Sequence, residues 1–287
     1  MAFHGSIKSA KQWTKVLKLQ AFCRRPSPEE LQQVLEAAES GNLEIFKRLY
    51  VAEPTRLFIK DSRGRTVVHQ AAFRNRTNIL QFIHEKRGDL DNQDNAGNTP
   101  LHVAVENESL DAINFLLEHG VQTDILNEKH QAVIHLATEL NKVNVLNVLS
   151  KYKEKIDVEQ GGEHGRTALH IAAIYDHAEC AITLINEFGA SPKKACNNGY
   201  YPIHEAAKNA SSETMEVFLK WGEKNGCKRS EMISFPDAEG NVPLHSAVHG
   251  GDIKAVQLCL TSGAKISTQQ HDCQLLFTLL VRKVLWT

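Results

Sequence analysis

Short stretches with apolar residues at helical spacing recur along the chain, and polar turn sequences separate them. Each stretch places three or four apolar residues on one face, which predicts an α-helix that buries that face. The apolar positions of four such stretches are Ile79, Leu80, Phe82 and Ile83; Ile113, Phe115, Leu116 and Leu117; Val145, Leu146, Val148 and Leu149; and Ala181, Ile182, Leu184 and Ile185. Two more lie within 215–218 and 256–260. One short helix cannot bury such a face alone, so neighbouring units must stack on it.

A tetrapeptide that ends in histidine precedes each of these stretches. The six copies are Thr66-Val-Val-His69, Thr99-Pro-Leu-His102, Ala132-Val-Ile-His135, Thr167-Ala-Leu-His170, Tyr201-Pro-Ile-His204 and Val242-Pro-Leu-His245. Their histidines are 33, 33, 35, 34 and 41 residues apart. This pattern is the ankyrin signature, T-P-L-H-x-A at a period near 33 residues. It predicts an all-α ankyrin-repeat solenoid of stacked helix-turn-helix units with turn or hairpin connections.

The motif has a physical reason at each position. Threonine can cap a helix N-terminus, and proline at the first helical position leaves no donor unpaired. Small pairs such as Ala71-Ala72 and Ala172-Ala173 let helices approach closely. The imidazole can bridge neighbouring turns through its two nitrogens. We therefore interpret the six histidines as structural residues, on successive layers that cannot readily converge on one metal ion.

Turn sequences that join the units supply the candidate contact residues. Residues 61–64, 94–97 and 237–240 each begin with Asp and end with a Gly that accepts positive φ, whereas 127–130 lacks that Gly. Side chains at the tips escape the stacking constraint. The candidate protein contacts are Ser62, Arg63, Asn95, Ala96, Glu128, Lys129, Glu163, His164, Asn198, Ala238 and Glu239.

Three segments organise the chain: a basic leader over 1–28, a repeat array of about seven units over 29–272, and a non-ankyrin tail over 273–287. The first unit is degenerate, because residues 31–49 have the helix-turn-helix pattern with Leu35 in the histidine slot. Ser27-Pro-Glu-Glu is a helix start. The tail has no repeat features. Inserting one base before the Cys273 codon restores T-P-x-H-x-A with a histidine at position 278, so we expect a frameshifted repeat; a natural short terminus is the alternative.

The leader contains six Lys and Arg residues between positions 8 and 25 and no Asp or Glu in residues 1–25. Trp13, Val16, Leu17 and Ala21 lie at helical spacing. A basic amphipathic helix can contact anionic lipid or calmodulin weakly through residues 8–25. The alternative, favoured by its thin apolar face, is a leader that is disordered alone or caps the first repeat.

Composition excludes several function classes. The 287 residues carry 33 Lys plus Arg and 34 Asp plus Glu, a formal net charge of −1 that argues against nucleic-acid binding. No apolar run approaches the roughly 20 residues that span a bilayer. Six scattered cysteines without a CxxC pair favour free thiols in a reducing compartment. No arrangement typical of catalysis or of a phosphate loop is present, so we predict no enzyme and no cofactor or metal.

Three stretches outside the repeat consensus carry a more specific resemblance. They are residues 127–142, residues 161–177, and a third that runs from Cys196-Asn-Asn-Gly-Tyr-Tyr-Pro-Ile-His204 through Trp221-Gly-Glu-Lys-Asn-Gly226 to 232–235. The third contains the seven-residue excess of the 41-residue spacing. From about Glu29 to Asp272 the chain resembles transient receptor potential ankyrin-type cation channels, especially the insect members.

The resemblance implies a long cytosolic ankyrin domain ahead of six membrane helices, in a tetramer at the plasma membrane that passes cations including calcium. Members of the family respond to heat, irritant chemicals or both. This segment would act as scaffold and regulatory element, with neighbouring subunits or cytosolic proteins as partners. The chain contains no pore or selectivity filter and no match to the family's reactive cysteines. The alternative is a free-standing ankyrin adaptor that binds protein partners.

Overall fold

Residues 27–265 are described by the computed structural model. Within that range every regular element is a helix, and β pairing is confined to one isolated bridge between Lys60 and Thr66. Seven helix pairs follow one another at the spacing of the histidine motif. The residues fall into two compact units that meet in sequence between Val133 and Ile134. Residues 8–25 and 273–287, with the expectations attached to them, lie outside the described part.

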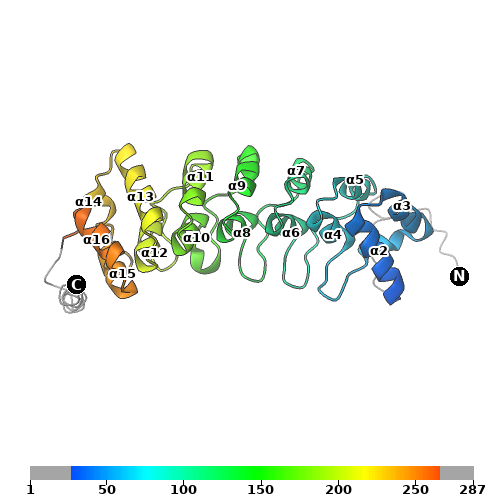
Figure 1. The fold of residues 1–287 in the computed structure, drawn as a ribbon, viewed down its shortest axis with the longest axis horizontal. Helices are drawn as coiled ribbons and strands as arrows, with labels where there is room; N and C mark the ends of the chain where they lie inside the picture. Colours follow the sequence, from blue (N-terminus) through cyan, green and yellow to red (C-terminus); the bar gives the residue numbers. More distant parts are fainter. Residues whose placement is uncertain (1–26, 266–287) are drawn as a thin grey trace. The chain divides into compact units, whose positions relative to one another are not determined.

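The first unit contains three helix pairs, shown in blue to cyan in Figure 1. Its elements are α2 (Pro28–Ser40), α3 (Leu43–Ala52), η1 (Pro54–Phe58), α4 (Val67–Phe73), α5 (Thr77–Glu85), α6 (Pro100–Glu106) and α7 (Leu110–Glu118). The first helix of each pair packs on the first helix of the next, so α4 contacts α2 and α6. The second helices do the same, so α5 contacts α3 and α7. Two helical layers result.

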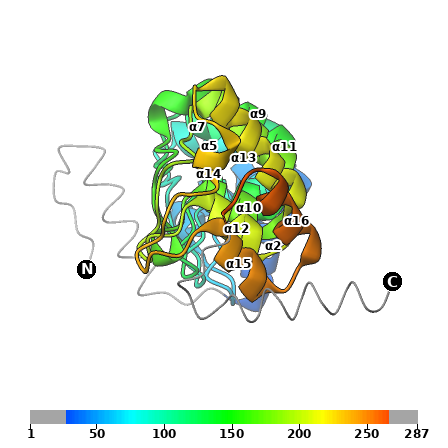
Figure 2. The ribbon, with the colours of Figure 1, turned by 90° about the vertical axis from the view of Figure 1, so that its left-hand side faces the viewer.

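The second unit repeats this arrangement with irregular additions. Its elements are α8 (Val133–Glu139), α9 (Val143–Leu149), η2 (Ser150–Lys155), η3 (Glu163–Gly165), α10 (Ala168–Tyr175), α11 (Ala178–Phe188), α12 (Pro202–Lys208), α13 (Ser212–Lys224), α14 (Arg229–Met232), α15 (Pro243–Gly250) and α16 (Ile253–Thr261). Figure 2 shows α10, α12 and α15 in one layer and α9, α11 and α13 in the other. We call these the inner and outer helices of the repeats.

The first described helix begins where the sequence predicts. The Ser27 hydroxyl accepts a hydrogen bond from the Glu30 backbone N–H, and the Glu30 carboxylate accepts one from the Ser27 backbone N–H. This reciprocal pair satisfies two donors that the helix start leaves free. Val34, Ala37 and Ala38 are buried, as in the later inner helices, while Leu35 is half-buried in the histidine slot.

The core lies between the layers and consists mainly of the predicted apolar faces. Ile79, Leu80 and Ile83 are fully buried, and the alanine pair Ala71-Ala72 lies where inner helices meet. The expectation that Ile182 belongs to the buried face of α11 is wrong, because its side chain is 43% exposed. Helical spacing explains the error: Cys180, Ala181 and Leu184 share one face, and Ile182, which follows Ala181, points away from that face.

The long 41-residue interval corresponds to an inserted segment in the sixth repeat. The outer helix α13 has 13 residues, and the short helix α14 follows it. Gly222 permits α14 to pack closely, since a Cβ there would lie 2.6 Å from the Met232 Cγ. The Lys193 ammonium lies over the rings of Trp221 and Phe235, at 5.9 and 5.4 Å from their centroids. The insertion therefore packs against its own repeat as an ordered element.

One backbone position after each inner helix always takes the left-handed conformation. It lies six residues after the motif histidine, or after Leu35 in the first repeat, and its φ is between 54° and 77° in all seven repeats. The residues in this slot are Gly41, Asn75, Glu108, Asn141, Asp176, Ala210 and Gly251. Left-handed backbone costs a residue with a Cβ about 1–2 kcal/mol, so five repeats carry local strain at the turn between their helices.

Polar residues in this slot also stabilise the following repeat. The Asn75 side-chain oxygen accepts a hydrogen bond from the backbone N–H of Ala112, the third residue of α7, at 2.7 Å. Asp176 accepts from the equivalent N–H of Thr214 in α13 at 2.9 Å. Ala210 has no such side chain, and the next outer helix is instead capped by its own Asp252, which accepts from the Ala255 N–H.

We predict that Ala210→Gly raises the free energy of unfolding by about 1 kcal/mol, because glycine adopts positive φ without a Cβ clash. The reciprocal change in the next repeat, Gly251→Ala, is expected to lower it by a similar amount, and open space surrounds that position. Urea unfolding followed by circular dichroism measures both. Equal stability of the two variants would contradict the strain assigned to this slot.

Candidate functional site: the histidine ladder and the inter-repeat turns

Five motif histidines, His69, His102, His170, His204 and His245, are held from their own repeats through Nδ1. The backbone N–H three residues earlier donates to this nitrogen in His69, His102 and His170, at 3.1 to 3.2 Å, and Thr66, Thr99 and Thr167 supply the N–H groups. His204 and His245 accept in the same way from Tyr201 and Val242. An imidazole nitrogen that accepts from an amide carries no proton, so Nδ1 is the unprotonated nitrogen of the ring.

The other ring nitrogen reaches the turn of the next repeat. Nε2 lies 2.9–3.1 Å from a backbone carbonyl in five histidines, and the pairs are His69 with Asn98, His102 with Gln131, His135 with Gln160, His170 with Tyr200, and His204 with Asn241. A carbonyl can only accept, so Nε2–H donates. The ladder of bonds therefore requires the neutral imidazole with its proton on Nε2.

Burial favours the same neutral state. His69, His135, His170 and His204 are at most 1% exposed. Desolvation lowers the pKa of each imidazole below its ordinary value, against the opposing effect of the carbonyl it contacts, and it lowers the pKa of His170 to about 4. A buried cation would lose both its solvation and the amide donor at Nδ1.

The predicted contact residues all lie at the exposed tips of the turns. Ser62, Arg63, Asn95, Ala96, Glu128, Lys129, Glu163, His164, Asn198, Ala238 and Glu239 are exposed without exception. Successive tips are joined through their backbones: the Asn95 N–H donates to the Arg63 carbonyl and the Glu128 N–H to the Ala96 carbonyl. In the second unit the Asn197 N–H donates to the His164 carbonyl. The exposed side chains are thus carried on a fixed backbone.

Turns without the expected glycine reach the same geometry by other means. In the 127–130 turn, His130 takes the left-handed position at φ 54°. The Asn127 side-chain oxygen accepts from the backbone N–H groups of Lys129 and Gln131, as Asp94 does for Ala96 and Asn98. An asparagine in the aspartate position was the signal that could have predicted this turn.

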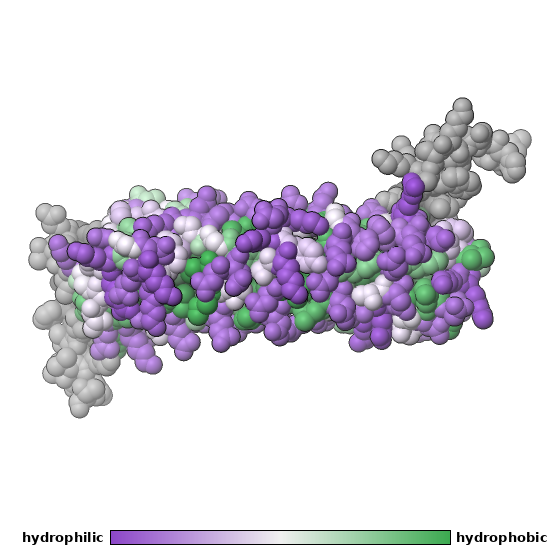
Figure 3. All heavy atoms as spheres, turned by 90° about the horizontal axis from the view of Figure 1, so that it is seen from above, coloured by the Kyte–Doolittle hydropathy of each residue, from purple (hydrophilic) through white to green (hydrophobic). Residues whose placement is uncertain are grey.

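Other surface features are modest. Among the residues that the structure describes, the large hydrophobic side chains that are exposed are Ile45, Val51, Leu140, Tyr175 and Ile182. In the view of Figure 3, hydrophobic areas are small and lie among hydrophilic residues. Across residues 27–265, no helix is long and apolar enough to cross a bilayer, and no three potential metal-ligating side chains come together.

The four cysteines of the described range are buried free thiols: Cys180, Cys196, Cys227 and Cys259. Burial raises the pKa of Cys180 to about 11 and that of Cys259 to about 12. Both thiols are therefore kept protonated and unreactive at neutral pH.

Comparison with known families agrees with this geometry. A profile of three ankyrin repeats matches residues 34–127 and 120–196, and a single-repeat profile matches residues 239–271. The chain belongs to the ankyrin-repeat family. The solved ankyrin-repeat domain of human ASB11 has the same fold, with a TM-score of 0.64 at 22% identity, over 84% of this chain and all of that one.

The resemblance to ankyrin-type transient receptor potential channels is also confirmed. The chain is 66% identical over 95% of its length to transient receptor potential cation channel subfamily A member 1 of Drosophila melanogaster. The human protein of the same name is 40% identical over 39% of the chain. The matched region spans 22% of the Drosophila protein and 10% of the human one. Ankyrin repeats and a channel relative point to a protein that is not an enzyme.

The ladder predicts that this ankyrin array loses stability in mild acid. The unfolded chain binds protons at its histidines near pH 6.5, whereas the folded pKa values are lower, so the free energy of unfolding is highest above pH 6.5 and falls as the pH drops towards 4. His170 alone should contribute a loss of about 3 kcal/mol over that window. Urea unfolding at several pH values measures the slope.

The matched variants are His170→Gln, which should flatten the pH dependence, and His164→Gln at an exposed turn tip, which should leave it unchanged. An unaltered slope in His170→Gln would show that this imidazole is not held neutral by the ladder.

Proposed function

We propose that this chain is the cytosolic N-terminal ankyrin segment of a sensory, calcium-permeable cation channel that responds to heat or chemicals. The observation that carries the proposal is the 66% identity with the Drosophila channel subunit over 95% of the chain, which spans only part of that subunit. The pore and the membrane helices would belong to the rest of such a protein. The segment itself acts as scaffold and regulatory element at the inner face of the plasma membrane.

The histidine ladder supports a scaffold role. Each described bond from Nε2 joins one repeat to the turn of the next, so a displacement of one repeat is transmitted to its neighbour through a buried imidazole. Repeat arrays change conformation through these nearest-neighbour interfaces. Unstacking of one repeat of low stability would change the position of the array relative to the rest of the channel, and the array would regulate the channel in this way.

The turn tips are the surface through which the segment would contact neighbouring subunits or cytosolic proteins. Their eleven predicted contact residues are exposed on a hydrogen-bonded backbone, so binding orders only side chains. The same observation favours the alternative function, a free-standing ankyrin adaptor. The predicted contact of residues 8–25 with lipid or calmodulin stays a prediction, as does the frameshift expected at 273–287.

A chimera tests the channel proposal. The segment of the Drosophila subunit that matches this chain is replaced by this chain, and whole-cell currents are recorded during heating and during exposure to an electrophilic irritant. We expect calcium-permeable currents. His170→Ala in the chimera should reduce them, because the Tyr200 carbonyl and Thr167 N–H lose a buried partner at a cost of about 1–3 kcal/mol.

Ile182→Ala, at an exposed position of the neighbouring outer helix, is the matched control and should conduct normally. A chimera that reaches the cell surface with a protease-resistant array but gives no current under either stimulus would contradict the channel proposal and favour the adaptor.

A further inference from the structure

Polar side chains join successive repeats at several repeat junctions. Between α4 and α6 the bridging residue is Arg65, four positions before the motif histidine. Its Nε lies 3.4 Å from the Asp94 carboxylate in the next turn, and its guanidinium also reaches Glu106 at 3.9 Å. The Asp94 side chain is 3% exposed, so the arginine neutralises a carboxylate that solvent scarcely reaches.

The same position is bridged elsewhere in both units. Asn98 accepts a hydrogen bond from the Asn127 side chain at 3.1 Å. Between α10 and α12, the Arg166 Nε lies 2.9 Å from the Glu205 carboxylate. At each of these junctions, a side chain of this protein therefore supplies the hydrogen-bond or ion-pair partner for a polar side chain of the neighbouring repeat.

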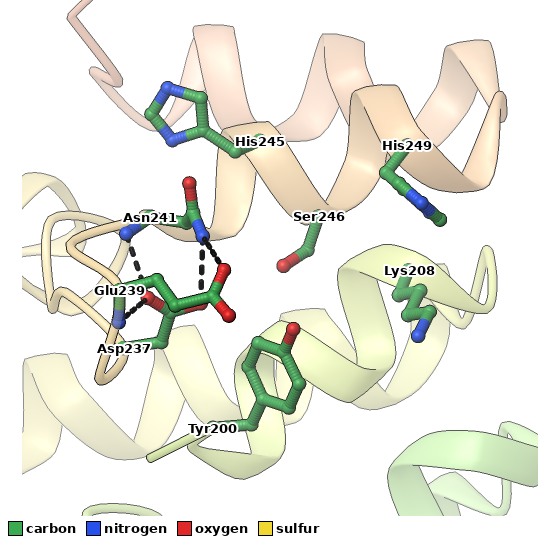
Figure 4. Close-up of a pocket in the computed structure, with 8 residues that line it drawn as sticks. All are labelled: Tyr200, Lys208, Asp237, Glu239, Asn241, His245, Ser246 and His249. Atoms are coloured by element: carbon green, nitrogen blue, oxygen red, sulfur yellow. Dashed lines mark hydrogen bonds between the residues drawn. The ribbon is translucent and has the colours of Figure 1, made fainter. Parts of the chain in front are cut away.

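The junction between α12 and α15 departs from this rule. Tyr200 occupies the arginine position there, and a cavity of about 280 Å³ lies beside it (Figure 4). Asp237, the equivalent of Asp94, is 7% exposed, and Glu239 lies next to it. Their carboxylates accept hydrogen bonds from Asn241 and from the turn backbone, and no cation of the described residues pairs with either. Burial and then these two acids raise the pKa of the Tyr200 phenol.

A second observation points to a ligand in this cavity. Ser246 on α15 is only 8% exposed, and its hydroxyl points into the cavity in Figure 4. Within residues 27–265 that hydroxyl forms no hydrogen bond, nor does the Tyr200 phenol oxygen. A hydroxyl group that faces a cavity without a protein partner is normally satisfied by water or by a bound molecule.

We propose that this cavity, the α12–α15 pocket, binds the side chain of an arginine presented by a partner protein. The guanidinium would replace the internal arginine found at the other junctions, with its N–H groups donating to Asp237, Glu239 and the Ser246 hydroxyl. Guanidinium groups pair with carboxylates in a fixed planar geometry and stack on aromatic faces, and the Tyr200 ring forms one wall.

The opposite end of the pocket determines which residues of the partner can flank that arginine. Lys208 and His249 lie there, away from the two acids in Figure 4, and neither forms an ion pair within the described residues, although the Lys208 ammonium lies over the Tyr200 ring at 6.0 Å from its centroid. Their N–H groups would donate hydrogen bonds to carbonyl or carboxylate groups of the same bound segment. The pocket thus fits an arginine in a segment of mixed charge better than a run of basic residues, which Lys208 would repel.

This inference names the partner chemistry for the protein-binding role in the proposed function. The probe is N-acetyl-arginine amide, titrated into the full 287-residue chain while the backbone amide signals are followed by nuclear magnetic resonance. We expect saturable shifts centred on Glu239, Asn241 and Ser246. N-acetyl-citrulline amide, which has the same shape without the charge, should bind at least about tenfold more weakly.

Substitutions decide whether the pocket is responsible. Tyr200→Arg supplies an internal arginine as at Arg65, and it should abolish binding of the probe without lowering the melting temperature. Glu239→Gln and Ser246→Ala should each weaken binding by roughly threefold to tenfold. Tyr175→Arg is the matched control, because Tyr175 is an exposed tyrosine outside the pocket, and it should bind like the parent chain.

Three results would overturn the proposal: equal binding of the arginine and citrulline probes, shifts centred outside the pocket, or unchanged binding in folded Glu239→Gln and Ser246→Ala. Since this titration uses the isolated chain and the chimera reports current, failure of either proposal is distinguishable from failure of the other.

Discussion

The two-sided hydrogen bonding of a buried, neutral imidazole is the interaction on which this array depends. Nδ1 accepts from the start of its own inner helix, and Nε2 donates to a carbonyl in the following turn. The first bond fixes the ring relative to its repeat, and the second fixes the next repeat relative to the ring. One side chain therefore sets both the start of a helix and the spacing between repeats, and the imidazole that forms both bonds is buried. Apolar stacking supplies the larger share of stability but does not define a register as closely.

The turns follow from that constraint. The carbonyl that accepts from Nε2–H belongs to the base of the next turn, so the histidine fixes the position of that turn relative to its own repeat. The tips of successive turns then lie close enough to form backbone hydrogen bonds with one another. Close approach at this point explains the glycines: a Cβ on Gly97 would lie 2.9 Å from the Glu128 nitrogen. The surface available for binding is a row of side chains on a backbone that the buried histidines hold in place.

Much of this architecture was predictable from sequence because the determining residues recur. The histidine motif predicted six of the repeats and the starts of their inner helices, the helix-turn-helix pattern of residues 31–49 predicted the first repeat, and Ser27-Pro-Glu-Glu predicted its cap. Single positions were harder. Ile182 was misplaced because an apolar residue beside a buried face looks the same in sequence as one within it. The left-handed slot was hidden because Asn75, Glu108 and Ala210 share no side-chain property. The α12–α15 pocket depends on comparing Tyr200 with Arg65 across repeats and on knowing which atoms already have partners.

The slot between the two helices of a repeat has a consequence for how such arrays can be rearranged. Asn75 and Asp176 cap the outer helix of the repeat that follows, so part of what stabilises a helix is encoded in the preceding repeat. A repeat moved, duplicated or deleted as a block inherits its cap from a new neighbour. Ala210 provides no cap for the outer helix of the seventh repeat, and Asp252 of that repeat caps this helix instead. The order of the repeats therefore matters, because the outer helix of each repeat must be compatible with the slot residue of the repeat before it.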